Sequence, residues 1–309
     1  MSYEGRMLRD YNMPTKHNVK NALLRALLHH NGTIKEFNSG EEIVSEIADE
    51  FELTYRQRNA FLETFYNKEN RVKKSNLWNR LLFRAADTLA KEKMIIRPSK
   101  TIKLTNKKEW MLTEDGIDNA LKMSKFSETQ KDKLQTKSFE LQKIVNKLND
   151  TSRPEGYNPI NKKKKITKVT KQSSLRTRAF RQAVIVAYDY KCSICGLKIY
   201  SPDSYFWEVE AAHIVPHRLK GKDDIWNGIA LCHLHHWAFD VGWFTLQDNY
   251  KIKISTRINN LPSGFGKISN YDFLSDLMNS SSSLLLPTIV DLYPHEKSIQ
   301  WHRQNIFYQ

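Results

Sequence analysis

The chain has 309 residues, enough for two ordinary domains that each bury a core. Its 49 Lys and Arg against 34 Asp and Glu give a net charge of +15, which favours a polyanionic partner, most often nucleic acid. No apolar run approaches the roughly 20 residues that span a bilayer, and Met1 to Asp10 is too charged for a secretory signal. We therefore expect a cytoplasmic protein with no membrane partner. On charge alone, an ordinary basic protein remains the alternative.

Periodic apolar residues predict four helices in the first part of the chain, followed by a short hairpin. The helices are expected over residues 17–30, from Ser39-Gly40 onward, from Thr54 through Phe65, and over residues 77–93. The hairpin is expected between Thr101 and Leu112, with residues 106–108 in its turn. Short helices, then a basic helix, then a hairpin are the layout of a winged helix-turn-helix domain, which we place in residues 1–125.

Three segments of this region resemble the amino-terminal winged-helix domain of Mrr-type restriction proteins. They are Asn79-Arg80, Lys-Glu-Lys-Met-Ile at residues 91–95, and Trp-Met-Leu-Thr-Glu-Asp-Gly at residues 110–116. The resemblance implies double-stranded DNA binding, with the basic helix in the major groove and the hairpin on the backbone. The candidate DNA contacts are Arg80, Arg84, Lys107 and Lys108. The Mrr nuclease core has another fold, so this resemblance suggests restriction without predicting a catalytic motif. A winged helix that makes only protein contacts is the alternative.

A lysine-rich segment over residues 126–173 predicts a basic helical linker. One amphipathic helix is expected over residues 134–148, and Pro154 and Pro159 mark breaks after it. Between residues 162 and 181 there are nine Lys or Arg residues and no acid. Such a run is typical of a solvated linker and can also lie along phosphates. Lys164 and Arg178 are the candidate DNA contacts of this segment.

All three cysteines lie in two short pairs that predict a zinc site. Cys192 and Cys195 form a C-x2-C pair, and Cys232 and His235 form a C-x2-H pair. Two intervening residues let one tight turn direct both ligands at one ion, and three sulfurs with one nitrogen suit tetrahedral zinc. His233 is the alternative fourth ligand. Because four protein ligands leave no open position, the zinc is expected to be structural.

Three further segments lie between and after these two ligand pairs and predict a second, catalytic metal site. They read Glu-Val-Glu-Ala-Ala-His-Ile-Val-Pro-His at 208–217, Ile-Trp-Asn-Gly at 225–228 and His-His-Trp-Ala-Phe-Asp at 235–240. The pattern indicates a strand that ends in His213, a loop that ends at Asn227, and a short helix. His236 and Asp240 lie at i and i+4 of that helix, on one face, as two ligands of one ion require.

This order of His, Asn and His, together with the predicted zinc site, resembles the HNH nuclease family over residues 185–250. The resemblance implies a ββα-metal fold within a nuclease domain that we place in residues 174–309, and hence an α+β protein. It implies that His213 is the general base, that Asn227 holds the loop and orients His213, and that His236 and Asp240 bind one divalent ion. A histidine beside a carboxylate accepts either Mg or Mn.

One position departs from the family pattern. Many HNH enzymes have a metal-binding Asp or His directly before the base, where this chain has Ala212. Glu210 points to the same face of the strand and is a candidate for reaching the ion, directly or through water. Alternatively, His213 binds the metal and His217 serves as the base.

These features together predict a restriction-type endonuclease that cleaves duplex DNA. One HNH site cuts one strand, so we expect a homodimer on DNA. The Mrr resemblance also allows an endonuclease that depends on modified bases. A non-catalytic DNA-binding regulator is the alternative of another class, although it would not need His213, Asn227, His236 and Asp240 together. The apolar residues of the tail, residues 251–309, predict packing against the nuclease domain.

Overall fold

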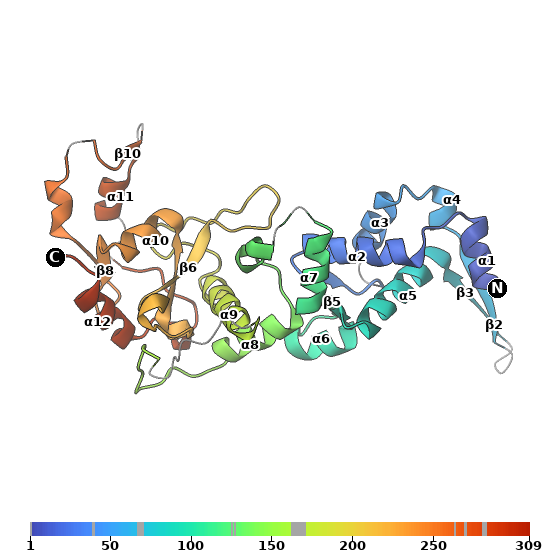
Figure 1. Cartoon of the computed structure of the whole chain (residues 1–309), viewed down its shortest axis with the longest axis horizontal. Helices are drawn as coiled ribbons and strands as arrows, with labels where there is room; N and C mark the ends of the chain where they lie inside the picture. The colour runs from blue at the N-terminus through green and yellow to red at the C-terminus, as the bar shows by residue number, and fades with distance from the viewer. Residues whose placement is uncertain are drawn as a thin grey trace. The chain divides into compact units, whose positions relative to one another are not determined.

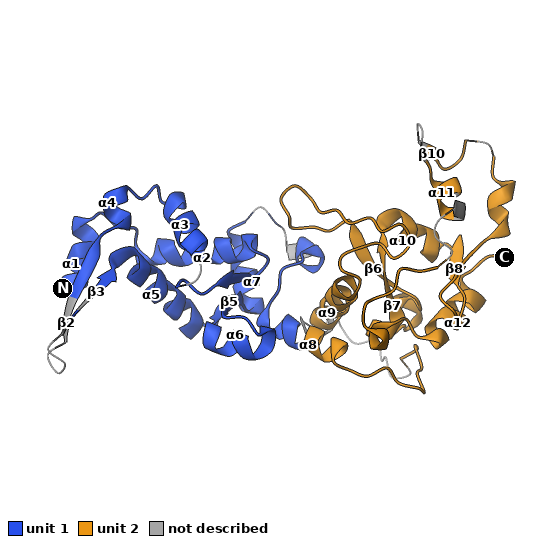
Figure 2. Ribbon diagram, turned by 180° about the vertical axis from the view of Figure 1, so that it is seen from behind, with its two compact units in different colours: residues 1–143 blue, residues 144–309 orange. Residues whose placement is uncertain are grey.

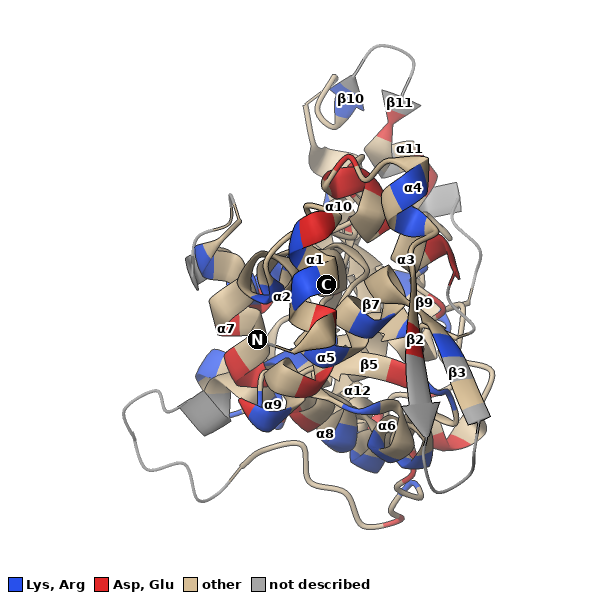
Figure 3. Cartoon of the chain, turned by 90° about the vertical axis from the view of Figure 1, so that its right-hand side faces the viewer, with Lys and Arg blue, Asp and Glu red and all other residues tan. Residues whose placement is uncertain are grey.

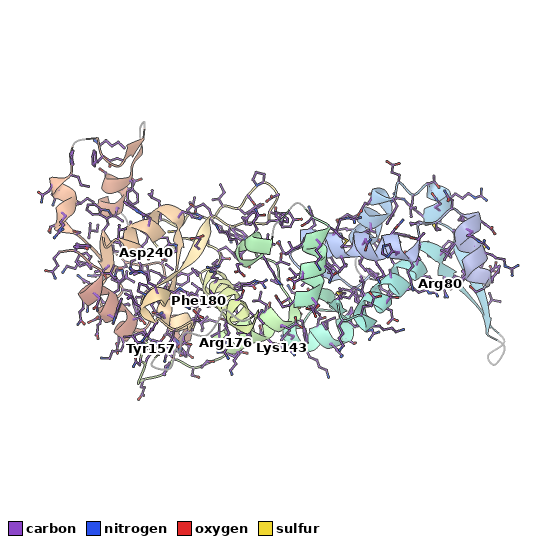
Figure 4. All side chains as sticks on the ribbon, viewed as in Figure 1. Arg80, Lys143, Tyr157, Arg176, Phe180 and Asp240 are labelled. Atoms are coloured by element: carbon purple, nitrogen blue, oxygen red, sulfur yellow. The ribbon has the colours of Figure 1, made fainter. Side chains whose placement is uncertain are left out.

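The computed structural model describes residues 2–38, 41–66, 71–124, 126, 128–161, 171–262, 264–268, 271–279 and 283–309. The chain divides into two compact units, Met1–Lys143 and Ile144–Gln309 (Figures 1 and 2). The division falls inside helix α8 (Phe139–Asn149), on which Lys143 is labelled in Figure 4. Among the described residues, no helix combines the length and the apolar character that crossing a membrane requires.

Helices form the core of unit 1. Their bounds are α1 Tyr3–Asp10, α2 Lys16–His29, α3 Glu41–Glu50, α5 Leu77–Lys91 and α7 Glu114–Lys122. The predicted helices over 17–30 and 77–93 are confirmed as α2 and α5, and the helix expected after Ser39-Gly40 is α3. Helix α2 packs against α5, α7 and α3. Its Leu23 and Leu27 and the Leu82 side chain of α5 are fully buried, so the apolar stripes read from the sequence form this core.

A three-stranded antiparallel sheet completes unit 1. Strand β5 (Glu109–Leu112) lies between β1 (Thr33–Lys35) and β4 (Ile95–Ile96). Thr113 then caps α7, because its Oγ1 accepts a hydrogen bond from the Gly116 amide at 3.0 Å. A Cβ at Gly116 would lie 2.0 Å from the Met94 carbonyl oxygen, so only glycine fits there. The Leu-Thr-x-x-Gly segment is therefore the junction of this sheet with α7.

The predicted third helix is wrong beyond its first turn. Helix α4 (Tyr55–Arg58) begins at the capping residue Thr54 and is followed by a hairpin of β2 (Phe61–Tyr66) and β3 (Arg71–Asn76). Phe61 and Glu63 are exposed while Leu62 between them is buried, which is the two-residue period of a strand. The aromatic residues of β2 favour a strand, whereas the spacing of its apolar residues predicts a helix.

The hairpin predicted between Thr101 and Leu112 is wrong in its first half. Residues Pro98–Thr105 form helix α6, and only β5 is a strand. Pro98 begins this helix, because its fixed φ and missing N–H suit the first helical turn. Asn106, with a φ of 58°, ends the helix. Lys107 and Lys108 therefore lie between a helix and a strand.

Unit 2 is built around a two-stranded antiparallel sheet and a helix that follows it. Strand β6 (Val209–His213) pairs with β7 (Gly228–Cys232), and helix α10 (His233–Asp240) begins directly after β7. Helix α9 (Lys171–Ala187) packs on both strands. A Cβ at Gly228 would lie 2.5 Å from Val184 and 2.9 Å from Phe180, so this glycine allows α9 to approach β7 closely.

The remaining elements of unit 2 follow α10, and β8 packs against both α10 and α12. They are β8 Phe244–Leu246, β9 Ile252–Ile254, β10 Lys267–Ile268, β11 Tyr271–Asp272, α11 Phe273–Asn279 and α12 Glu296–Asn305. Turns of 3-10 helix lie at His217–Leu219, Ile225–Asn227, Thr256–Asn260 and Val290–Leu292 in unit 2 and at Glu128–Lys133 in unit 1. The buried His302 of α12 stacks on Phe239 and bonds its carbonyl at 3.1 Å. Burial lowers the pKa of His302 to about 4, so it packs as a neutral ring. The packing expected of the tail is thus confirmed.

Candidate active site and zinc site

Asn227 holds together the loop between β6 and β7. Its side chain is fully buried. Its Oδ1 accepts a hydrogen bond from the Val215 amide at 2.9 Å, and its Nδ2 donates to the carbonyls of Val215 at 3.1 Å and Lys222 at 3.0 Å. A Cβ at Gly221 would lie 1.8 Å from the Val215 carbonyl oxygen, so the loop folds tightly over the amide. One side chain thus satisfies three backbone groups of the loop.

Replacing Asn227 with alanine is expected to lower the free energy of unfolding of unit 2 by about 3–5 kcal/mol, because three buried backbone groups lose their partner. Chemical denaturation measures this loss. The exposed Asn260 provides a matched control, whose alanine variant is expected to change stability by less than about 0.5 kcal/mol. Equal stability of the two variants would show that Asn227 does not organise the loop.

His213 is the last residue of β6, opposite Gly228 in the register. Its Nε2 lies 3.0 Å from Oδ1 of Asp223, a residue of the Asn227 loop. The Phe180 ring of α9 stacks on the imidazole with centroids 4.1 Å apart and an interplanar angle of 25°. The side chain is 15% exposed, so one edge remains open to solvent. These contacts fix the ring of His213 in one plane without closing it off.

His236 and Asp240 lie one turn apart on α10, with Nε2 and Oδ2 separated by 3.6 Å. On the other side of the ring, Nδ1 of His236 lies 3.1 Å from Oε2 of Glu210 on β6. Glu210 also lies 3.3 Å from Nε2 of His233. An imidazole nitrogen beside a carboxylate is a donor pair that Mg or Mn accepts, so Nε2 and Oδ2 fit one divalent ion. Glu210 contacts the other nitrogen of the same ring, Nδ1.

The charges of this cluster are coupled. The hydrogen bond to His236 holds the pKa of Glu210 at about 2, so Glu210 is ionised. Burial alone would lower the pKa of His236, but the hydrogen bond to Glu210 and the charge of Asp240 raise it. Burial raises the pKa of Asp240, which is the carboxylate on the exposed side. The cluster thus concentrates negative charge around one imidazole, as a cation site requires.

The four predicted zinc ligands lie together in unit 2. Their donor atoms are all within 4.8 Å of one another. Nδ1 of His235 is 3.0 Å from Sγ of Cys232 and 3.7 Å from Sγ of Cys192. Zinc lies about 2.3 Å from sulfur and 2.0–2.1 Å from nitrogen, so tetrahedral ligands are separated by distances of this order. The set of donors therefore fits zinc.

The local backbone explains how the knuckles form. Gly196, at a φ of 72°, lets its amide turn back to the Cys192 carbonyl at 2.9 Å. The neighbouring Cys195 and Cys232 side chains lower the pKa of Cys192, which favours the thiolate that a metal needs. His233, the alternative fourth ligand, instead contacts Glu208 at 3.2 Å. The site joins the end of α9 to the start of α10.

Three of the four predicted DNA contacts of unit 1 lie near carboxylates. Arg80 and Arg84 of α5 bond the carboxylate of Glu4 at 2.9 and 2.6 Å, and Arg80 is labelled in Figure 4. Helix α5 also carries the acidic Asp87 (Figure 3), so it is not a uniformly basic face. Lys108 lies 3.9 Å from Glu36, and Lys107 is exposed. DNA would have to compete with Glu4 for both arginines.

The two predicted contacts of the basic segment have different outcomes. Lys164 lies outside the described residues. Arg178 is only 5% exposed, so its assignment as a phosphate contact is corrected: the side chain is packed inside unit 2. The reason is the helical period, since Arg178 lies on the same side of α9 as the buried Gln182 and Ile185, four and seven residues later. Arg176 of the same helix is exposed (Figure 4).

Two residues beside His213 could not be identified from the sequence. Asp223 lies in the loop between β6 and β7, and Phe180 lies before the zinc knuckles, on α9. Neither has a fixed spacing from His213 in any regular element. The only signal was a pair of acids, Asp223 and Asp224, in a loop that must fold back onto the strand.

One comparison with known protein families agrees with the motif of this site. Residues 192–247 match a protein family described as HNH endonuclease. No curated protein matches the chain significantly. One solved structure with a similar chain is titled "Modification dependent TagI restriction endonuclease", at 20% sequence identity and a TM-score of 0.29. The similarity covers 41% of this chain and 37% of that chain, so this chain spans less than two thirds of it.

Proposed function

We propose that the protein, whose residues 192–247 match the HNH endonuclease family, is a restriction-type endonuclease that hydrolyses phosphodiester bonds of duplex DNA. The observation that supports this most is the position of His213. It lies at the end of β6, beside the loop that Asn227 holds, with the His236 and Asp240 pair on the helix that follows β7. A base, a loop clamp and a cation pair in one strand-loop-helix unit are what phosphodiester hydrolysis needs.

The residues of the chain divide the work as follows. His213 accepts a proton from the water molecule that attacks the phosphate. Asn227 keeps the loop folded against β6 and does not touch the reacting atoms. His236 and Asp240 hold one Mg or Mn ion, which when bound neutralises charge on the phosphate and on the leaving oxygen. The zinc held by Cys192, Cys195, Cys232 and His235 has only a structural role.

We propose that Glu210 orients His236 and does not bind the ion directly. A metal-binding histidine usually donates its second N–H to a carboxylate, which fixes the tautomer and the ring orientation. Glu210 lies on Nδ1 of His236, whereas Asp240 lies on Nε2. We therefore assign Nε2 to the ion and Glu210 to the outer contact. Its carboxylate supplies on β6 part of the negative charge that position 212 lacks.

Unit 1 supplies target recognition in this proposal. Its elements α2, β1, α3, α5, β4 and β5 follow one another in this order, with other elements between them, and together with the antiparallel sheet β1-β5-β4 they support a winged-helix domain. Helix α5 takes the place of the helix that enters the major groove. Helix α6 stands between β4 and β5, where a winged helix has its wing, so contacts with the DNA backbone are assigned to the α6–β5 turn with Lys107 and Lys108.

The metal assignment predicts that Asp240→Ala lowers Mn²⁺ affinity and cleavage together, each by about 10- to 1000-fold, because one ligand of the ion is lost. Mn²⁺ binding is measured by electron paramagnetic resonance, and cleavage is measured on a supercoiled plasmid. Asp276→Ala removes an exposed carboxylate from α11 and is expected to leave both unchanged. Wild-type Mn²⁺ affinity in Asp240→Ala would contradict the assignment.

A further inference from the structure

Asp223 makes the closest polar contact of His213. The Oδ1 atom of Asp223 lies 3.0 Å from Nε2 of the imidazole, and both side chains are mostly buried, at 19% and 15% exposure. A carboxylate at this distance accepts a hydrogen bond from the ring N–H. It thereby selects one of the two neutral tautomers of the histidine, the one with its proton on Nε2.

Helix α9 fixes both members of this pair. The Oγ1 atom of Thr177 lies 3.4 Å from Oδ2 of Asp223, and the Phe180 ring, three residues later on the helix, covers one face of His213. Residues at i and i+3 lie on the same side of a helix, so one face of α9 supports both the carboxylate and the imidazole. Phe180 is fully buried, so packing holds its ring in place against the imidazole of His213.

The Asn227 loop fixes Asp223 from the other side. Nδ2 of Asn227 donates a hydrogen bond to the carbonyl of Lys222, the residue directly before Asp223. The backbone that carries the carboxylate is thus held by the same amide that holds Val215, two residues after His213. The effect of Asn227 on His213 passes through the backbone on both sides of the His213–Asp223 pair.

We propose that Asp223 is a positioning residue that keeps the proton of neutral His213 on Nε2 and so makes Nδ1 the proton acceptor. This inference rests on the proposed role of His213 as the base. In the step, a water O–H proton moves to Nδ1 while Nε2–H stays bonded to Asp223. The water oxygen forms a bond to phosphorus, one ester P–O bond breaks, and the leaving oxygen takes a proton from solvent. The carboxylate then stabilises the imidazolium that has formed.

The test compares Asp223→Asn with Asp224→Asn. Asp224 is the neighbouring carboxyl group in the same loop, but its partner is the Tyr157 hydroxyl at 3.3 Å. Burial raises the pKa of Asp224, so a neutral amide is a mild change there. In Asp223→Asn, the amide can donate to Nε2 and favour the wrong tautomer. We expect kcat on plasmid DNA to fall by about 100- to 10,000-fold with KM unchanged, and to stay within about threefold in Asp224→Asn.

A second readout does not depend on catalysis. Nitrogen NMR of histidine-labelled protein, with His213 assigned by its absence in His213→Ala, reports the tautomer directly. The expected result is an Nε2–H signal for His213 in the wild type and its loss in Asp223→Asn. An Nδ1–H tautomer in the wild type, or equal kcat in the two Asn variants, would overturn the proposal. Undiminished cleavage by His213→Ala would instead refute the base assignment, while the tautomer would still decide whether Asp223 positions the ring.

Discussion

Replacing Cys232 with serine is expected to remove zinc from the protein and to destabilise unit 2 by about 5 kcal/mol, which corresponds to a fall in Tm of about 10–20 °C. Cys232 ends β7 and His235 lies in the first turn of α10, while Cys192 and Cys195 follow α9. A zinc ion held by these four ligands would link the segment after α9 to the junction of β7 and α10. Structural zinc contributes directly to folding free energy, and a ligand lost from a four-coordinate site releases much of it.

Metal analysis by mass spectrometry and thermal unfolding measure the two consequences. The matched control is His233→Ala, because His233 is next to Cys232 but contacts Glu208 and Glu210 rather than the cysteines. This variant is expected to keep one zinc ion per chain, whereas His235→Ala loses it. Loss of zinc from His233→Ala together with retention in His235→Ala would assign the fourth ligand to the wrong histidine.

The second large effect concerns chemistry rather than folding. His213→Ala is expected to reduce plasmid cleavage by at least about 100- to 10,000-fold, because the proposed proton acceptor is removed. Metal binding and stability should change little, since the ion is held on α10 and the zinc site lies elsewhere in unit 2. Cleavage rates at saturating Mn²⁺ measure the first effect, and Mn²⁺ titration with thermal unfolding measures the second.

His217→Ala separates the two assignments of the base. The His217 ring lies with its centroid 5.7 Å from that of His213, close enough to make it the competing candidate. We expect His217→Ala to retain most of the cleavage activity, because the His213 ring is the one held by Asp223 and Phe180. Retained cleavage in His213→Ala with loss in His217→Ala, accompanied by weaker Mn²⁺ binding in His213→Ala, would instead make His217 the base and His213 a metal ligand.

The parts of this site that could be predicted are those with a short and fixed spacing. His236 and Asp240 are four residues apart on one helix, and each zinc knuckle has two residues between its ligands. Local geometry alone then brings the donor atoms together. No fixed spacing relates His213 to Asp223 or His236 to Glu210. Asp223 reaches its histidine through a folded loop, so its role depends on tertiary structure.

The fold of unit 1 shows the same limit. Helices α2 and α5 have long apolar stripes and were predicted, whereas the apolar residues of β2 were read as a helix. Short apolar runs fit either period, and the choice is made by packing. The prediction for Arg178 is wrong for a related reason. The run of basic residues predicts a solvated segment, but α9 places the Arg178 side chain inside unit 2.

The most direct test of the nuclease assignment is cleavage of supercoiled plasmid by the full chain. Methylated and unmethylated plasmids are incubated with Mg²⁺ or Mn²⁺, with and without a chelator, beside the His213→Ala variant. Wild type is expected to give nicked or linear product, and this product is expected to disappear with the chelator and in the variant. A preference for the methylated plasmid would identify a modification-dependent enzyme. Intact plasmids of both kinds, bound equally by wild type and variant, would contradict the nuclease assignment and favour a DNA-binding regulator.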